Sequence, residues 1–283
     1  MLSVKVGLVD TTGTVTAETM AAAAAALNTQ VTRDLPQYWP ITATVAYLPN
    51  PHQIPQGVWP VQLVASLPPG EGGFHQTKRN QPFAKVIVTP DSDEWTVDAS
   101  HETIEMLIDP SGNRLQTATA IQIVGNDVQE GTGQFEYLVE ACDPCEADDF
   151  TYAIDGVRVS DFITPHFYDT TATDGTRYSF TGAIKRPLQI LPGGYISFLD
   201  PQTNEIQQIL WVDPNQPPQL KDLGSAAGSG LGDHENLRVF VENKTHFHVR
   251  QHRSRASEAT RAARKAHRDK IAAAAEIRAK RYV

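Results

Sequence analysis

The sequence predicts an α+β fold, and three observations support this prediction. Strand patterns alternate with two helix patterns up to residue 108. Short strands and turns replace them in the second half, and residues 254–282 read as one long basic helix. Strands and helices in separate stretches are typical of α+β rather than of strictly alternating α/β architecture. The length of 283 residues suits one large domain or two small ones.

The first half of the chain contains the clearest elements. Residues 2–9 alternate as a strand, and a helix is expected to start at Thr16, pass through six consecutive alanines and continue toward Arg33. Alanine is the best helix former, and a threonine at the start can cap the first turn. Further elements are expected as strands over 41–48, 61–66 and 83–88 and as a helix over 96–108.

The second half predicts a mixed, β-rich region and then a separate tail. Strands are expected over 133–139, 152–159 and 189–198. Proline and glycine concentrate in 213–236, which reads as a linker. A last strand over 237–241 and the basic helix over 254–282 follow. We therefore expect an α+β domain over 1–212, a linker over 213–236 and a tail over 237–283.

Charge is divided unevenly along the chain. The formal net charge is −9, but residues 244–283 contain twelve basic and three acidic residues, a net of +9. Residues 1–243 hold the other 12 basic and 30 acidic residues, a net of −18. This acidic body excludes nucleic-acid binding over the whole surface. Only the basic tail (residues 244–283) could contact a polyanion such as nucleic-acid phosphate.

Three features of the sequence bear on the compartment in which the protein is found. No apolar run reaches the roughly 18 residues that a membrane span needs. Residues 1–10 lack the basic and long apolar regions of a signal peptide. The only cysteines, Cys142 and Cys145, exclude a disulfide scaffold and favour a reducing compartment. We expect a cytoplasmic protein without membrane contact, in which both cysteines are ordinary thiols.

One stretch of the predicted 96–108 helix indicates chemistry. His101 and Glu105 are four residues apart, so on a helix their side chains share one face and can bind one metal ion. Glu102 lies beside them, where the general base of a zinc peptidase would be. A catalytic site also needs a third protein ligand and an open position for water.

This stretch resembles the zincin metallopeptidases, whose signature is His-Glu-x-x-His on a helix. The chain is also similar to a group of bacterial and phage proteins in three segments: Ser-His-Glu-x-x-Glu-Met-Leu-x-Asp-Pro at 100–110, Cys-Asp-Pro at 142–144 and Val-Ser-Asp-Phe-x-Thr-Pro at 159–165. The resemblance covers roughly residues 1–170. It implies a zincin-like domain with a mixed sheet, an N-terminal helix and a motif helix, and a virion-associated location.

The same resemblance implies site roles, with one departure. His101 would be a metal ligand and Glu102 the base, but Glu105 stands where zincins have their second histidine. A carboxylate there gives a harder, more anionic site, which is compatible with zinc, manganese, calcium or no metal. The candidates for a further ligand are Asp143, then Glu140, then Glu146, with His75 and His166 as the histidines. The alternative is a buried hydrogen-bonded network in a silent fold.

Two functions remain open from the sequence. In the first, the chain is a structural or assembly component of a phage or phage-derived particle. Its basic tail then docks on a neighbouring subunit or on a polyanion. In the second, it is an active metal-dependent peptidase that uses the His-Glu-x-x-Glu site. We favour the first, because Glu105 departs from the zincin signature and because the tail helix has little apolar surface of its own.

Overall fold

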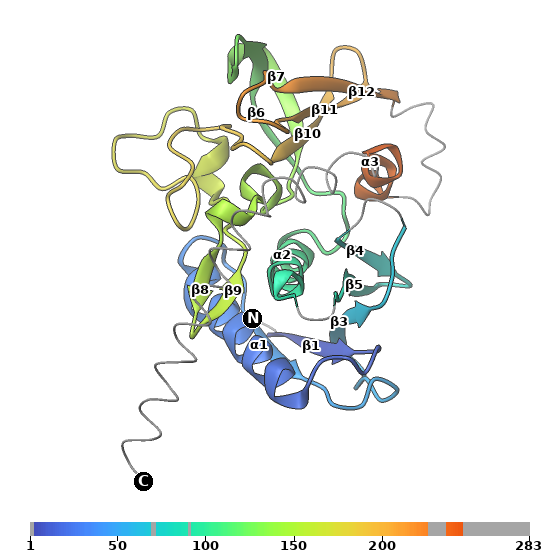
Figure 1. Ribbon diagram of the computed structural model, residues 1–283. Coiled ribbons are helices and arrows are strands. Elements are labelled where there is room, and N and C mark those ends of the chain that lie inside the picture. The colour runs from blue at the N-terminus through green and yellow to red at the C-terminus, as the bar shows by residue number, and fades with distance from the viewer. Residues whose placement is uncertain (1–2, 69–71, 90–91, 226–235, 246–283) are drawn as a thin grey trace.

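The computed structural model describes residues 3–68, 72–89, 92–225 and 236–245, and these residues form an α+β fold. Two five-stranded sheets face each other, with helices between them (Figure 1). The basic helix expected over 254–282, and nearly all of the basic tail, lie outside the described residues. Within the described residues, no helix has the length and apolar character needed to cross a membrane.

The first sheet belongs to the N-terminal part of the chain. Its strand order is β2-β1-β3-β5-β4; the first four strands are parallel, and β4 pairs antiparallel with β5 at the edge. The strands are β1 (Val4–Asp10), β2 (Ala43–Tyr47), β3 (Val58–Val64), β4 (Gly73–Lys78) and β5 (Gln81–Ile87). The strands expected over 2–9, 41–48, 61–66 and 83–88 are confirmed, whereas β4 was not expected.

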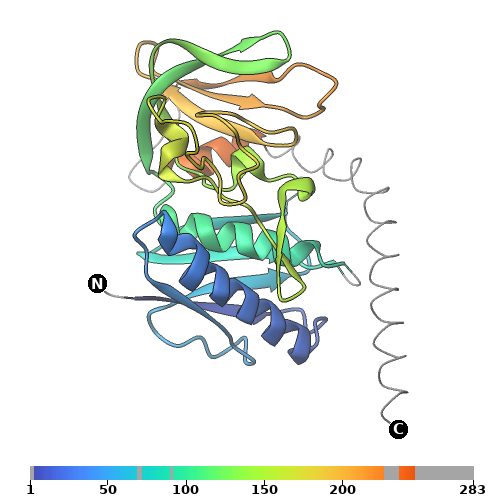
Figure 2. The same ribbon diagram turned by 90° about the vertical axis from the view of Figure 1, so that its left-hand side faces the viewer.

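Helices α1 (Ala17–Thr29) and α2 (Glu94–Ile108) cover this sheet and run side by side (Figure 2). The Thr16 side chain accepts a hydrogen bond from the Thr19 amide at 3.2 Å, so the expected cap is confirmed. A π-helical turn over Gln30–Asp34 continues α1, in agreement with the expected extension toward Arg33. From Ala99 to Ile108 every residue of α2 is buried, because other segments cover the side turned away from the sheet.

The second sheet is antiparallel and contains the later strands in the order β12-β11-β10-β7-β6. They are β6 (Leu115–Val124), β7 (Asp127–Leu138), β10 (Tyr195–Asp200), β11 (Glu205–Leu210) and β12 (Gln219–Ser225). The expected strands over 133–139 and 189–198 overlap β7 and β10. Strand β12 falls inside the stretch expected to be a linker over 213–236.

A small hairpin joins the two layers. The strand expected over 152–159 is in fact two short strands, β8 (Tyr152–Ile154) and β9 (Val157–Val159), which pair antiparallel. The turn between them places Asp155 and Gly156 at positive φ, a backbone conformation that a continuous strand cannot contain. Strand β9 packs against both α1 and α2, so this hairpin closes the open side of α2.

The strand expected over 237–241 is wrong, because Leu237–Thr245 forms helix α3. Its buried residues Arg238, Val241 and Thr245 follow helical spacing. The short apolar run of this segment suggested a strand, but burial of Arg238 favours the helix. An ion pair between Arg238 and Glu242, one turn apart, accompanies the helix.

The core is continuous across both layers. The main cluster of buried apolar residues runs from Val6 in β1 to Ile209 in β11. A small separate cluster attaches α3 to the second sheet and contains Leu138, Ile206, Leu223, Phe240 and Val241. Strands of both sheets thus contribute to one main core, and α3 packs on the second sheet through the smaller, satellite cluster.

Candidate metal centre

A closed ring of hydrogen bonds fixes α2 at the start of the motif. The Ser100 hydroxyl donates to Gln30 Oε1 at 2.8 Å, and Gln30 Nε2 donates to the Ser160 carbonyl oxygen at 2.9 Å. The Ser160 amide in turn donates to Ser100 Oγ at 2.9 Å. All three residues are buried. Segments 100–110 and 159–165, two of the three singled out in the sequence analysis, therefore meet at this ring.

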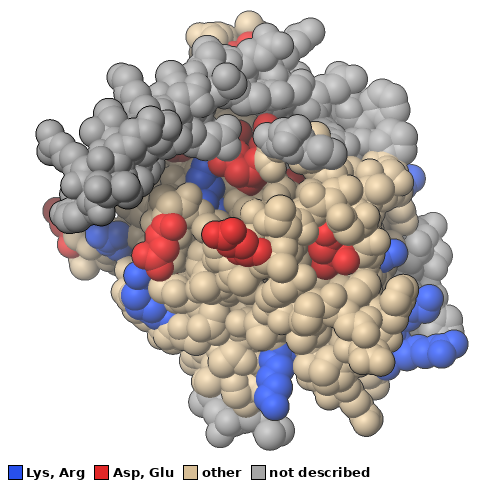
Figure 3. All heavy atoms as spheres, turned by 60° about the horizontal axis from the view of Figure 1, so that its bottom comes forward, with Lys and Arg blue, Asp and Glu red and all other residues tan. Residues whose placement is uncertain are grey.

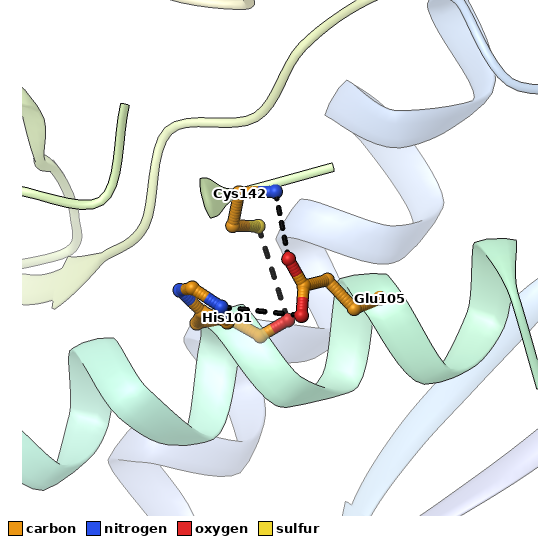
Figure 4. Close-up of side chains that lie close together, drawn as sticks. All are labelled: His101, Glu105 and Cys142. Carbon is orange, nitrogen blue, oxygen red and sulfur yellow. Dashed lines mark hydrogen bonds and ion pairs between the residues drawn. The ribbon is translucent and has the colours of Figure 1, made fainter. Parts of the chain in front are cut away.

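The third segment meets the motif through its backbone. The Cys142 amide donates to Glu105 Oε1 at 3.0 Å (Figure 4). This bond turns the other oxygen of Glu105, Oε2, toward His101, whose Nε2 lies 3.2 Å away. The two side chains of the predicted ligand pair thus face each other one helical turn apart.

Asp143 completes the predicted set of ligands. It begins a short 3-10 turn, Asp143–Cys145, and its Oδ1 lies 3.2 Å from His101 Nε2. Gly194 backs this turn so closely that an added Cβ would lie 2.7 Å from the Asp143 carbonyl oxygen. The glycine therefore lets the turn approach, and Glu105 and Asp143 each place one carboxylate oxygen 3.2 Å from His101 Nε2.

The remaining candidate ligands differ in how close they lie to the predicted set. Glu140 and Glu146 are buried and have carboxylate oxygens within 4.8 Å of members of the predicted set. His75, on β4, lies on the other side of Glu105, with 3.9 Å between its Nδ1 and Glu105 Oε2. His166 is exposed and belongs to none of the possible metal-binding groups among the described residues.

Burial and crowding shift the pKa values of these groups. Burial alone would lower the pKa of His101, but the Glu105 and Asp143 carboxylates raise it well above its ordinary value. Burial would raise the pKa of Glu105, but His101 and the hydrogen bond from Cys142 bring it below that value. For Asp143, burial and the Glu105 charge raise the pKa well above the ordinary value.

The separations from His101 Nε2 are compatible with a divalent cation. Metal–ligand distances of about 2.0–2.2 Å place neighbouring donors around a tetrahedral ion roughly 3.3–3.6 Å apart. The two 3.2 Å separations from His101 Nε2 are close to this range. The possible metal-binding groups join His101 either with Glu105 and Cys142 or with Asp143 and Glu146. Glu105 Oε2 also lies 3.4 Å from Arg238 Nη2, so an ion there would share this oxygen with an internal cation. Zinc chemistry, if present, would consist of polarising a bound water or carbonyl.

The same distances also suit an ion triad without metal. A protonated His101 could donate from Nε2 to either carboxylate, which agrees with its raised pKa. Its Nδ1 has no hydrogen-bond partner among the described residues. A metal-binding imidazole usually donates its other ring hydrogen to a carboxylate or carbonyl. The buried network considered in the sequence analysis is thus compatible with this geometry.

Glu102, the predicted general base, is paired with a cation. Its Oε2 lies 3.1 Å from Arg238 Nη2 and 3.4 Å from His75 Nδ1. Its chain packs on Gly73, where an added Cβ would lie 2.9 Å from Glu102 Cγ. Both Glu102 and Arg238 are about 5% exposed, at 4% and 5%. Burial, partly opposed by His101, and the Glu105 charge raise the pKa of Glu102 well above its ordinary value, and the carboxylate is shielded from solvent in this arrangement.

Arg238 is the residue of this site that the sequence analysis missed. It was assigned to the last expected strand, over 237–241, far in sequence from the motif helix. The one local signal was the pair of opposite charges at Arg238 and Glu242, whose spacing favours a helix over a strand. No sequence pattern connects position 238 to position 102.

Cys142 and Cys145 are buried free thiols. Burial and nearby carboxylates raise the pKa of both thiols well above their ordinary value. Cys142 Sγ lies 3.8 Å from the His101 carbonyl oxygen (Figure 4). It is also close enough to His101 and Glu105 to join them as a ligand. Both thiols are free in this structure, and Cys142 remains a candidate ligand.

The chain was compared with known proteins by sequence and by structure. No family model, no curated protein and no solved structure matches it.

Proposed function

We propose that this chain is a zincin-like domain that serves as a structural component of an assembly, with a closed His-Glu-Asp site that does not cleave peptides. The observation that carries the proposal is the pairing of Glu102 with Arg238 in a buried environment. General base catalysis needs a group that can reach the water it deprotonates. Burial and the neighbouring carboxylates raise the pKa of Glu102 well above its ordinary value, so its pKa does not oppose a base role. The obstacle is access, because Glu102 is buried and its Oε2 faces Arg238 instead of an open position for water.

The zincin-like part of the proposal is supported by the order of elements. Strand β1, helix α1, the four strands β2 to β5 and the motif helix α2 follow one another along the chain, with β4 antiparallel at the sheet edge. An N-terminal helix, a mixed sheet and a motif helix are the parts that the resemblance implied. The role in a phage or phage-derived particle rests on the same resemblance and on the division of charge between body and tail.

The proposed docking of the tail does not require one large acidic patch on the body. Acidic side chains on the face shown in Figure 3 stand apart from one another, separated by uncharged residues. Five acidic residues are instead buried around the site: Glu102, Glu105, Glu140, Asp143 and Glu146. Residues 244–283, with a net charge of +9, would then meet the body of a neighbouring copy through spread, salt-sensitive contacts.

The second candidate, a metal-dependent peptidase, is favoured by the convergence of His101, Glu105 and Asp143. If this candidate holds, these three residues bind the ion and Glu102 must first leave Arg238. The closed arrangement described here is then a resting form.

One pair of measurements separates the candidates. Purified full-length protein is analysed for metal by mass spectrometry and assayed for peptide cleavage beside the Glu102→Gln variant. We expect no cleavage above the level of that variant, whatever the metal content. Cleavage that is lost in Glu102→Gln would overturn the structural proposal and establish the peptidase.

The assembly role has its own test. Sedimentation velocity would compare the full chain with a chain ending at Thr245, which keeps α3 and removes most of the basic tail. We expect the full chain to form larger species that dissociate at high salt, and the shortened chain to remain smaller. Identical sedimentation of the two would contradict docking through the tail.

A further inference from the structure

The guanidinium of Arg238 uses all of its nitrogen atoms inside the protein. Nε lies 2.8 Å from Glu242 Oε1, and Nη2 lies 3.1 Å from Glu102 Oε2. Nη1 lies 2.8 Å from His75 Nε2 and 3.3 Å from Glu140 Oε2. Nη2 also lies 3.4 Å from Glu105 Oε2. Acceptors at all three nitrogen atoms suit the several donors of a guanidinium better than the single nitrogen of an ammonium.

The imidazole of His75 takes part as an acceptor. Because a guanidinium can only donate, Nε2 of His75 must accept, and the ring hydrogen is assigned to Nδ1, which faces Glu102. The approach of the Asp109 carbonyl oxygen to Nε2, at 3.1 Å, is then a contact and not a hydrogen bond. The pocket thus presents neutral imidazole and carboxylate acceptors to one cation.

Most of this pocket exists independently of α3. Glu102 comes from α2, His75 from β4 and Glu140 from the segment after β7. Only Glu242 belongs to the same helix as Arg238. These three acceptors are therefore supplied by elements other than α3, and a pocket for an arginine can form from them.

Helix α3 is bound much as a peptide would be. It has nine residues, a length at which an isolated helix is marginal in water, so its conformation depends on docking. Its apolar anchors, Phe240 and Val241, enter the satellite cluster and not the main core. At its start, the Arg238 amide donates to the Gly112 carbonyl oxygen at 3.0 Å, and the Leu237 amide donates to Asn113 Oδ1 at 2.7 Å.

We propose that this pocket is a recognition site for the arginine side chain of a helical segment. Arg238 fills it from within the same chain, and α3 of a second copy fills it by exchange. The recognised segment has the form Arg-x-Phe-Val, in which the arginine enters the acidic pocket and two apolar residues enter the satellite cluster. The proposal needs no metal and no catalysis, so it stands or fails separately from the proposed function.

The first test asks whether the pocket binds guanidinium in the absence of Arg238. Arg238→Ala in the full chain removes the side chain and leaves the pocket, and millimolar ethylguanidinium is then added. We expect it to raise the Tm of this variant by a few degrees in a saturable manner, and ethylammonium to have a smaller effect. Wild-type protein and Arg186→Ala, which loses a half-exposed arginine, should show no such increase. Equal effects on all three proteins would overturn the proposal.

The second test keeps Arg238 and does not depend on the stability of the first variant. Phe240→Ala weakens the docking of α3, so that a labelled peptide of residues 236–245 can compete with it. We expect saturable binding by fluorescence anisotropy, at least about ten-fold weaker for a peptide carrying Arg238→Lys. Competition by the unlabelled peptide should release the label. Equal affinity for the two peptides, or no binding of either, would contradict exchange of α3.

Discussion

Glu102 Oε2 and Arg238 Nη2 lie 3.1 Å apart, although the two residues come from helices separated by 136 positions in the sequence. This pair joins the motif helix α2 to the last described helix α3 at a buried position. It decides how the motif is interpreted, because the carboxylate expected to act as a base is engaged with an internal cation. The predictions below begin with this pair.

Replacing Arg238 with methionine should destabilise the protein by about 3–5 kcal/mol, the cost of leaving buried carboxylates without their cation. Urea unfolding followed by circular dichroism would measure the change in the free energy of unfolding. The matched control is Arg186→Met, because Arg186 pairs with Asp127 and both are more than a third exposed. Loss of that surface pair should cost no more than about 1 kcal/mol.

A double variant tests whether the cost arises from the pair itself. Glu102→Gln combined with Arg238→Met should be more stable than the sum of the single effects implies, since the amide needs no cation. A coupling free energy above about 1 kcal/mol would be typical of groups in contact. Additive effects would show that Arg238 acts mainly through its packing.

The metal-site prediction concerns Asp143 and Glu105. If the cluster holds a divalent cation, Asp143→Asn and Glu105→Gln should each lower the bound metal, because each weakens an anionic oxygen ligand. Mass spectrometry of extensively dialysed protein would give the metal content, and a chelator should lower the Tm of wild-type protein and of the control variant but not of the two ligand variants. His166→Asn is the control, since His166 is exposed and outside the cluster.

Equal metal content in all four proteins would mean that any bound ion lies elsewhere. Absence of metal from wild-type protein would favour the ion triad of His101 with its two carboxylates. In that case the same substitutions should still reduce stability, because each would remove one partner of a buried charged group.

The sequence predicted the N-terminal half of this protein well because its signals are local. Thr16 caps α1, six alanines extend it, and the spacing of His101 and Glu105 is meaningful only on a helix. Asp143 was predicted as a further ligand because it lies in an acidic segment and because of the resemblance. The structure places it beside His101 through the turn that Gly194 backs, which no local pattern specifies.

The errors of prediction arise where tertiary contacts override the local pattern. Strand β12 contains Gly224 at positive φ and lies after a proline-rich stretch, yet pairing with β11 holds it in the sheet. Leu237–Val241 alternates like a strand, but its second residue is a buried arginine that finds its partners on α2 and β4. Burial of a charge depends on groups distant in sequence, so this exception could not be anticipated.

Gly194→Ala should displace the turn that holds Asp143. An alanine Cβ there would lie 2.6 Å from the Pro144 carbonyl oxygen, a backbone atom that cannot rotate away. We expect a loss of about 1–3 kcal/mol in stability and a lower metal content if metal is bound. In the control, Gly131→Ala, the added Cβ would meet backbone at 3.4 Å, an ordinary contact. A similar small effect for both variants would contradict the proposed support of Asp143 by Gly194.

The ring of hydrogen bonds around Ser100 gives the last prediction. Ser100→Ala would leave Gln30 Oε1 and the Ser160 amide without their partner in a buried environment, at a cost of about 1–3 kcal/mol. The control is Thr32→Ala, which removes an exposed hydroxyl bonded to a helix carbonyl and should cost less than about 0.5 kcal/mol. Hydrogen exchange should then show faster opening of the Ser160 amide in Ser100→Ala, because that amide has lost its acceptor. Unchanged protection of the Ser160 amide would mean that packing of β9 against α2, and not the ring of hydrogen bonds, holds segments 100–110 and 159–165 together.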